Sequence, residues 1–200
     1  MTDRDRRLEV SEAAWRVIVR EGLARTSMRA IAQELGCTTG VVTHHFRDKS
    51  ELLRFALQQV TQHLQVAMVA AAQSAQGPER LVAMLATFLP QSLEETQLLQ
   101  VWLAFLGAAV GQPSLLHEHQ HSAAQLRALV VQELRTLAAA KMLRADLDPE
   151  QEANILLALV NGLSLDSLIQ AQRLQPAQQR AALQRYVQGL SPGTGTSRGG

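Results

Sequence analysis

The segment from Thr26 to Lys49 constrains the fold of this chain more than any other. Its sequence, TSMRAIAQELGCTTGVVTHHFRDK, is typical of two short helices joined by a tight turn, with a further helix beginning directly afterwards. Apolar residues recur three and four positions apart in its first half, at Met28, Ile31, Ala32 and Leu35. Gly36 follows, where a residue in the left-handed conformation ends a helix. The segment predicts a helix-turn-helix whose first helix is capped by Thr26 or Ser27.

The second helix of this motif, about 38–46, is polar on one side and apolar on the other. The polar side carries Thr38, Thr39, Thr43 and His44, and the apolar side carries Val41, Val42 and Phe46. Such a helix, docked through one face, suits insertion into a DNA major groove. Gly40 lies inside this helix and lowers the stability of the helix by about 1 kcal/mol relative to alanine. Close approach of the backbone to DNA, or packing against the preceding helix, would each explain this glycine.

Composition favours an all-α protein. The chain has 200 residues, of which 46% are hydrophobic and 18% charged, as in ordinary globular proteins. Glycine and proline are scarce until the C-terminal end, which favours helices. Cys37 is the single cysteine, so no intrachain disulfide forms, and we expect a buried structural thiol in a reducing compartment. We find no apolar signal core in the first ten residues, and the apolar run 101–110 is too short to span a bilayer. We therefore expect a cytoplasmic protein with no membrane partner.

The charge balance restricts how the chain can bind nucleic acid. The formal net charge is only +1, and the first fifty residues carry nine basic and seven acidic side chains. Affinity for DNA must therefore come from a local cluster of basic groups rather than from the whole molecule. Arg4, Arg6 and Arg7 would either reach phosphates or the minor groove, or remain solvated.

Apolar periodicity and helix-breaking residues predict about nine helices, near 5–21, 28–35, 38–46, 51–72, 79–89, 94–110, 113–140, 150–172 and 176–187. The run Asp48-Lys49-Ser50-Glu51 has the form of a capping box. We expect a three-helix DNA-binding domain over 5–50 and a connecting helix over 51–72. An effector-binding and dimerisation domain would follow over 73–190, with a disordered tail over 191–200.

The last two helices are unusually apolar. Residues 155–160 are apolar on almost every side, as are Leu163, Leu165, Leu168 and Ile169. A helix that is apolar all round needs partners all round. A second copy of the chain would supply them in a four-helix dimer interface. The alternative is a central core helix in a monomer.

Two histidines and three aromatic residues could bind a metal ion or an effector, or could be ordinary surface and core residues. His117 and His121 share a helix face, but no third metal ligand is evident, so we expect solvated surface and no metal. Phe88, Trp102 and Phe105 either pack in the core or line an effector cavity. An aromatic wall would hold a quaternary ammonium by cation–π attraction, whereas a Leu/Ala/Met lining suits a larger apolar molecule. We predict no cofactor.

No catalytic residue is predicted. The chain has no metal-binding histidine pair with a glutamate, no nucleophile elbow and no glycine loop for phosphate, which argues against an enzyme. A helical protein-interaction module, or a ligand-binding protein without DNA binding, remains an alternative. Neither would account for the helix-turn-helix.

The segment AIAQELGCTTGVVTHHFRDKSELL resembles the signature of TetR/AcrR-type transcriptional regulators. Its marks are Ile31-Ala32, Gly36, Gly40, His45-Phe46, Lys49 and Leu52-Leu53. Further on, VWLAFLGAAVGQP and LVNGLSLDSL resemble the betaine-regulator (BetI-like) branch of that family.

The resemblance implies a homodimer that represses transcription at a palindromic double-stranded DNA operator until a small-molecule effector binds. Thr38, Thr39, Thr43 and His44 would then face bases or nearby phosphates, with Gly40 between them. The DNA backbone would be contacted by Ser27, Arg29, His45 and Lys49. Short hydroxyl side chains permit this close approach, and Lys49 adds its charge beside a helix N-terminus.

Overall fold

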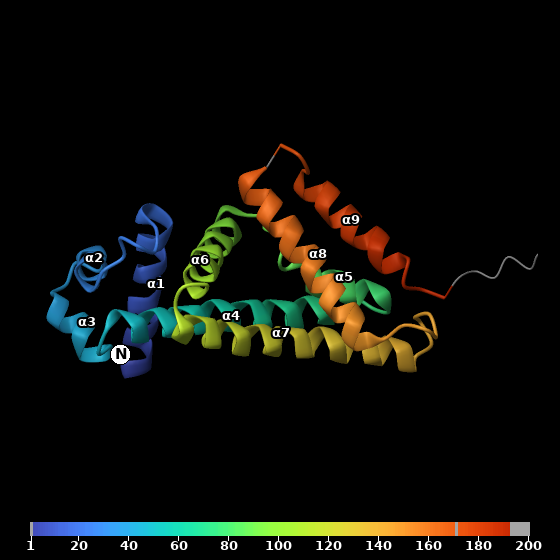
Figure 1. The fold of residues 1–200 in the computed structure, drawn as a ribbon, viewed down its shortest axis with the longest axis horizontal. Helices are drawn as coiled ribbons and strands as arrows, with labels where there is room; N and C mark the ends of the chain where they lie inside the picture. Colours follow the sequence, from blue (N-terminus) through green and yellow to red (C-terminus); the bar gives the residue numbers. More distant parts are fainter. Residues whose placement is uncertain (1, 171, 193–200) are drawn as a thin grey trace, which may run out of the picture. The chain divides into compact units, whose positions relative to one another are not determined.

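The computed structural model describes residues 2–170 and 172–192, and within these ranges the chain forms nine α-helices and no strand. The predicted all-α class is therefore confirmed (Figure 1). The helices divide into two compact units, neither of them continuous in sequence. Unit 1 comprises the described residues up to His63 together with Ser92–Ala124, and unit 2 comprises Leu64–Gln91 and the described residues from Gln125 onward.

Unit 1 holds the predicted helix-turn-helix. Its helices are α1 (Asp3–Glu21), α2 (Met28–Glu34), α3 (Thr39–His45), the first part of α4 (Lys49–Gln73), α6 (Leu93–Ala109) and the first part of α7 (Pro113–Ala139). The Asp48 carboxylate accepts the backbone N–H of Glu51 at 2.7 Å and so caps α4. The predicted capping box is wrong in one respect, because the Glu51 side chain accepts the N–H of Arg47 rather than that of Asp48.

Two apolar clusters hold unit 1 together. The first joins α1, α2, α3 and the start of α4, and its buried members are Val10, Ala13, Ala14, Val17, Ile31, Ala32, Val42, Phe46 and Leu52. The second joins α1, α4, α6 and α7 through Ile18, Leu53, Ala56, Leu57, Val60, Val101, Phe105, Ala109 and Leu115. The apolar stripes predicted for the helix-turn-helix are thus the faces that the fold buries.

Unit 2 contains the rest of α4 and α7, α5 (Pro78–Ala86), α8 (Pro149–Ile169) and α9 (Pro176–Gln188). Helices α8 and α9 lie side by side (Figure 1). Both α5 and α8 end three residues earlier than predicted. Of the predicted disordered tail, residues 193–200 lie outside the described part of the chain.

Helix α8 is apolar on both of its sides, as predicted. By length and composition alone it could cross a membrane. One face packs into the core of unit 2 through Ala153, Leu156, Val160 and Leu163. The opposite face is exposed, with Ile155 at 48%, Leu165 at 41% and Ile169 at 64% of full exposure. The buried face makes the contacts expected of a helix in a protein core. The exposed face has no partner among the described residues of this unit.

Two buried carboxylates in unit 2 have polar partners, as burial of charge requires. Glu133 accepts from Arg80 Nε at 2.9 Å, and Arg80 also donates to the carbonyl of Ala72. The Glu152 carboxylate accepts the Tyr186 hydroxyl at 2.8 Å. Burial, and then this bond to a carboxylate, raise the pKa of Tyr186 to about 12.

We expect Tyr186 to titrate about two pH units above a free tyrosine. It is the only tyrosine, so the absorbance of tyrosinate near 295 nm reports it alone. Because the folded-state pKa is raised, the associated stability is complete below pH 10 and is lost as the pH rises through about 12. The urea-unfolded chain should titrate near 10, and Glu152→Gln should lower the midpoint in the folded protein. A folded-state midpoint near 10 would contradict the contact.

Candidate nucleic-acid interface

The turn between α2 and α3 is built from local hydrogen bonds. Ser27 caps α2, its hydroxyl accepting the N–H of Ala30 at 3.1 Å. At the other end Gly36 takes φ +65°, the left-handed conformation predicted for it, and Cys37 donates to the carbonyl of Ala32 at 2.9 Å. Helices that end at a glycine commonly have this left-handed residue and this hydrogen bond at their C-terminus. The Cys37 thiol is half-buried against the first cluster of unit 1 rather than fully buried.

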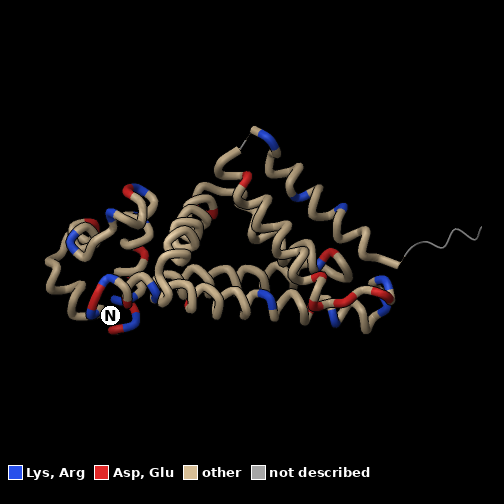
Figure 2. Tube along the Cα trace, viewed as in Figure 1, with Lys and Arg blue, Asp and Glu red and all other residues tan. Residues whose placement is uncertain are grey.

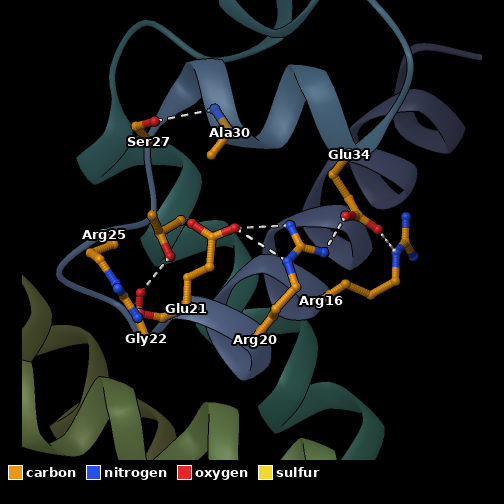
Figure 3. Close-up of polar contacts among 9 residues, drawn as sticks. Arg16, Arg20, Glu21, Gly22, Arg25, Ser27, Ala30 and Glu34 are labelled. Atoms are coloured by element: carbon orange, nitrogen blue, oxygen red, sulfur yellow. Dashed lines mark hydrogen bonds and ion pairs between the residues drawn. The ribbon is translucent and has the colours of Figure 1, made fainter.

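Ionic contacts from α1 fix α2 in place. Both oxygens of Glu34 are occupied, one accepting from Arg16 and the other from Arg20, each at 2.7 Å. Figure 3 shows Arg20 lying between Glu34 and Glu21. Hydrogen bonds from Arg20 and Arg16 hold the pKa of Glu34 below its usual value. These two arginines therefore serve to hold α2 against α1.

Helix α3 presents a continuous polar surface. Its exposed members are Thr38, Thr39, Gly40, Thr43 and His44. Val42 and Phe46 are fully buried on the opposite side, so the predicted amphipathic face is confirmed. Ordinary capping does not account for Thr38, whose side chain makes no capping hydrogen bond. The Thr43 hydroxyl points back to the carbonyls of Thr39 and Gly40, both at 3.2 Å, and can still accept a hydrogen bond from outside.

Gly40 is not explained by packing. A methyl group built there would meet only the Thr38 hydroxyl, at an ordinary contact distance of 3.7 Å. The suggestion that α2 packs against this glycine is therefore wrong. Close approach of DNA remains the prediction for its role.

Two predicted phosphate contacts are already bound within unit 1. The Nδ1 atom of His45 lies 2.6 Å from a carboxylate oxygen of Asp3. Lys49 donates from Nζ to the carbonyl of Leu23 at 3.2 Å. An ammonium group has three donors, so Lys49 can keep this bond and also meet a phosphate. By contrast Arg29 is exposed on α2 and has no acidic partner among the described residues.

The candidate effector residues fall in two units and are described separately. In unit 1, Phe105 is only 1% exposed and belongs to the second cluster. Trp102 is half-buried, with its ring centroid 6.0 Å from that of His119. In unit 2, Phe88 packs against the core while its carbonyl accepts the Ser164 hydroxyl. Whether any of them lines an effector site stays a prediction.

The histidines of α7 do not gather a metal site in the described residues. His117 and His121 are exposed, and His119 is turned toward Trp102, where burial lowers its pKa. No group of three His, Cys, Asp or Glu side chains suited to a metal ion lies in the part of the chain that the structure describes.

The position of Arg7 was not predicted from the sequence. This arginine was expected to be a phosphate contact or a solvated side chain, whereas the structure turns it toward α3 and α4. Helical spacing could have predicted that Arg7 turns inward, because it lies on the same face of α1 as Val10, Ala14 and Val17. All three of these residues are buried.

Comparisons with known proteins agree with this architecture. Residues 11–55 match the family model of bacterial regulatory proteins of the tetR family, and residues 78–192 match that of the BetI-type transcriptional repressor C-terminal region. The transcriptional regulator PksA of Bacillus subtilis is 27% identical over 187 residues, covering 92% of this chain and 89% of PksA. The regulator BetI of Escherichia coli K12 is 25% identical over 186 residues, covering 91% and 92%.

Solved structures share the fold. A transcriptional regulator from Pseudomonas aeruginosa PAO1 is 31% identical with a TM-score of 0.80, covering 95% of this chain and 92% of that one. A regulator from Saccharomonospora viridis, solved in complex with choline, has a TM-score of 0.80 at 24% identity, covering 90% and 94%.

A helix-turn-helix with an exposed polar second helix defines a DNA-binding protein. The chain belongs to the TetR family of bacterial regulatory proteins, with a C-terminal region of the BetI repressor type. It is thus a transcriptional repressor and not an enzyme, as the sequence predicted. The alternatives without DNA binding are wrong.

Proposed function

We propose that this repressor binds a palindromic operator as a homodimer and is released from it by a small-molecule effector. One observation carries the proposal. The polar side chains of α3 are exposed together, while Val42 and Phe46 anchor the same helix in the core. Each subunit would place α3 in a major groove, at two half-sites related by the two-fold axis of the dimer. Since it acts on DNA, the repressor would work in the cytoplasm.

Phosphate contacts would come from the residues around α3. Arg29 on α2 is the strongest candidate, because it is exposed and its charge is not matched by an acid among the described residues. Ser27 at the α2 N-terminus and Lys49 at the α4 N-terminus would add hydrogen bonds. His45 would have to leave Asp3, or bind phosphate through its other ring nitrogen.

Arg29→Ala tests this arrangement. We expect weaker binding to every DNA sequence and a salt dependence whose slope falls by about one unit for each arginine–phosphate pair removed, hence about two per dimer. Fluorescence anisotropy of labelled operator across a salt series measures both quantities. Arg135→Ala, which removes an exposed arginine of α7 paired with Glu150, is the control and should leave the slope unchanged. An unchanged slope for Arg29→Ala would contradict its role.

The dimer would form through α8 and α9. Figure 2 shows that α8 carries no charge over most of its length. Its exposed face is mainly apolar, with Asn154 and Asn161 beside Ile155, Ala158, Gly162, Leu165 and Ile169. The neighbouring α9 exposes Ala177 and Ala181. Small and branched apolar side chains on two adjacent helices suit a four-helix interface with a second copy.

The effector would bind in the region assigned to the C-terminal domain. Trp102 is the partly exposed aromatic candidate on α6, and its ring would hold a cationic ligand by cation–π attraction. A larger apolar molecule is the alternative. Either ligand would act by favouring a conformer in which the two α3 helices no longer match the half-site spacing, which requires different affinities for the two conformers.

A further inference from the structure

The guanidinium of Arg7 lies at the junction of three helices of unit 1. From α1, its Nη1 atom donates to the carbonyl of His45 at 2.9 Å. His45 is the last residue of α3, where a helix leaves carbonyl groups without partners inside the helix. Arg7 therefore caps the C-terminal end of the DNA-reading helix.

The same guanidinium also lies over two aromatic rings. Its central carbon is 4.3 Å from the ring centroid of Phe46, just after α3, and 4.9 Å from that of Phe55 on α4. The rings themselves are 5.5 Å apart. A planar cation over aromatic faces gains cation–π attraction, more so when little water surrounds it.

An acidic partner completes the site. Nη2 of Arg7 lies 3.2 Å from Glu51 Oε1, and both side chains are about three-quarters buried, with exposures of 26% and 22%. The other oxygen of Glu51 accepts the backbone N–H of Arg47 at 3.0 Å. Arg47 belongs to the short link between α3 and α4, so the Arg7–Glu51 pair fixes both the end of α3 and the segment that follows it.

We propose that Arg7 is a positioning residue that sets the angle of α3 for reading DNA and does not itself contact DNA. The proposal rests on the proposed function, in which α3 is the reading helix. With seven residues, α3 is too short to be stable alone, so its orientation depends on contacts at its ends. Reaching a phosphate would require Arg7 to give up its carbonyl, carboxylate and aromatic contacts together.

The test compares Arg7→Ala and Arg7→Lys with the full-length protein, on operator and on unrelated DNA. For Arg7→Ala we expect operator affinity to fall by about 10- to 100-fold, as for a hydrogen bond to a charged group. Binding to unrelated DNA and the salt slope should stay nearly unchanged, because every phosphate-binding side chain is kept. Arg7→Lys should not restore the affinity, since lysine lacks the planar fork. Amide hydrogen exchange over 40–46 should be faster in both variants.

Arg6→Ala is the matched control. It removes the same charge from the adjacent position of α1, but Arg6 binds Glu9 within that helix at 2.6 Å. Its amide hydrogen exchange over 40–46 should resemble that of the unaltered protein, because the Arg6–Glu9 pair lies within α1. A fall in salt slope for Arg7→Ala, equally weakened binding to both DNAs, or unchanged exchange over 40–46 would each overturn the positioning role. Failure of the unaltered protein to bind DNA would refute the proposed function instead, and the exchange measurement would still decide whether Arg7 holds α3.

Discussion

Replacing Leu165 with arginine should convert the dimer into monomers and abolish tight operator binding. Leu165 lies on the exposed face of α8, in the C-terminal half of the helix, and is 41% exposed. The change would place a charge in the apolar interface twice, once from each subunit, and burying it there is costly. A monomer holds one half-site only, so the gain from simultaneous engagement, on the order of 100-fold or more, disappears.

Analytical ultracentrifugation and operator anisotropy measure the two effects. Val66→Arg is the matched control, because Val66 is an exposed valine on α4 in the same unit, 64% exposed. It should remain dimeric and bind operator normally. Ile169→Arg, at a position 64% exposed, repeats the test should Leu165→Arg prove poorly folded. Dimers of both α8 variants with full operator affinity would show that another surface joins the subunits.

The helix-turn-helix could be predicted from the sequence because the residues that start and end its helices interact with close neighbours in the chain. Gly36 was expected to be left-handed because it follows an apolar helical stripe directly, and its φ is +65°. Asp48, and either Thr26 or Ser27, were expected at helix starts. In the structure Asp48 and Ser27 each accept an N–H three residues ahead. Such hydrogen bonds depend on neighbours within one turn, which the sequence displays directly.

Long-range polar contacts were not predictable in the same way. Arg7 and Glu51 are 44 residues apart, and His45 and Asp3 are 42 apart. Sequence spacing tells which helix face carries a side chain, but the partner depends on how the helices pack. Helix α6 illustrates the point, because its Val101, Phe105 and Ala109 pack with α1, α4 and α7 in unit 1. The boundary near residue 72, between the DNA-binding part and the effector-binding domain, stays a prediction.

Removing the reading surface itself, by the triple change Thr39→Ala, Thr43→Ala and His44→Ala, should reduce binding to the operator to nearly the level of unrelated DNA. A single hydrogen bond to a base contributes about 0.5–1.5 kcal/mol, so removing three such side chains from each subunit costs about 100-fold or more. All three side chains are exposed, and alanine is the best helix former, so α3 should stay folded. The salt dependence of DNA binding should hardly change in the triple variant, since no permanent charge is removed.

Competition of operator against unrelated DNA in the anisotropy assay measures the specificity ratio directly, and circular dichroism checks the fold. Gln62→Ala with His63→Ala is the control, because both side chains are exposed on α4 in unit 1. This pair should leave the ratio unchanged, since neither residue belongs to the polar face of α3. If the triple variant kept the ratio of the unaltered protein, the threonines and His44 would not read bases. Specificity would then have to come from DNA shape or from residues outside α3.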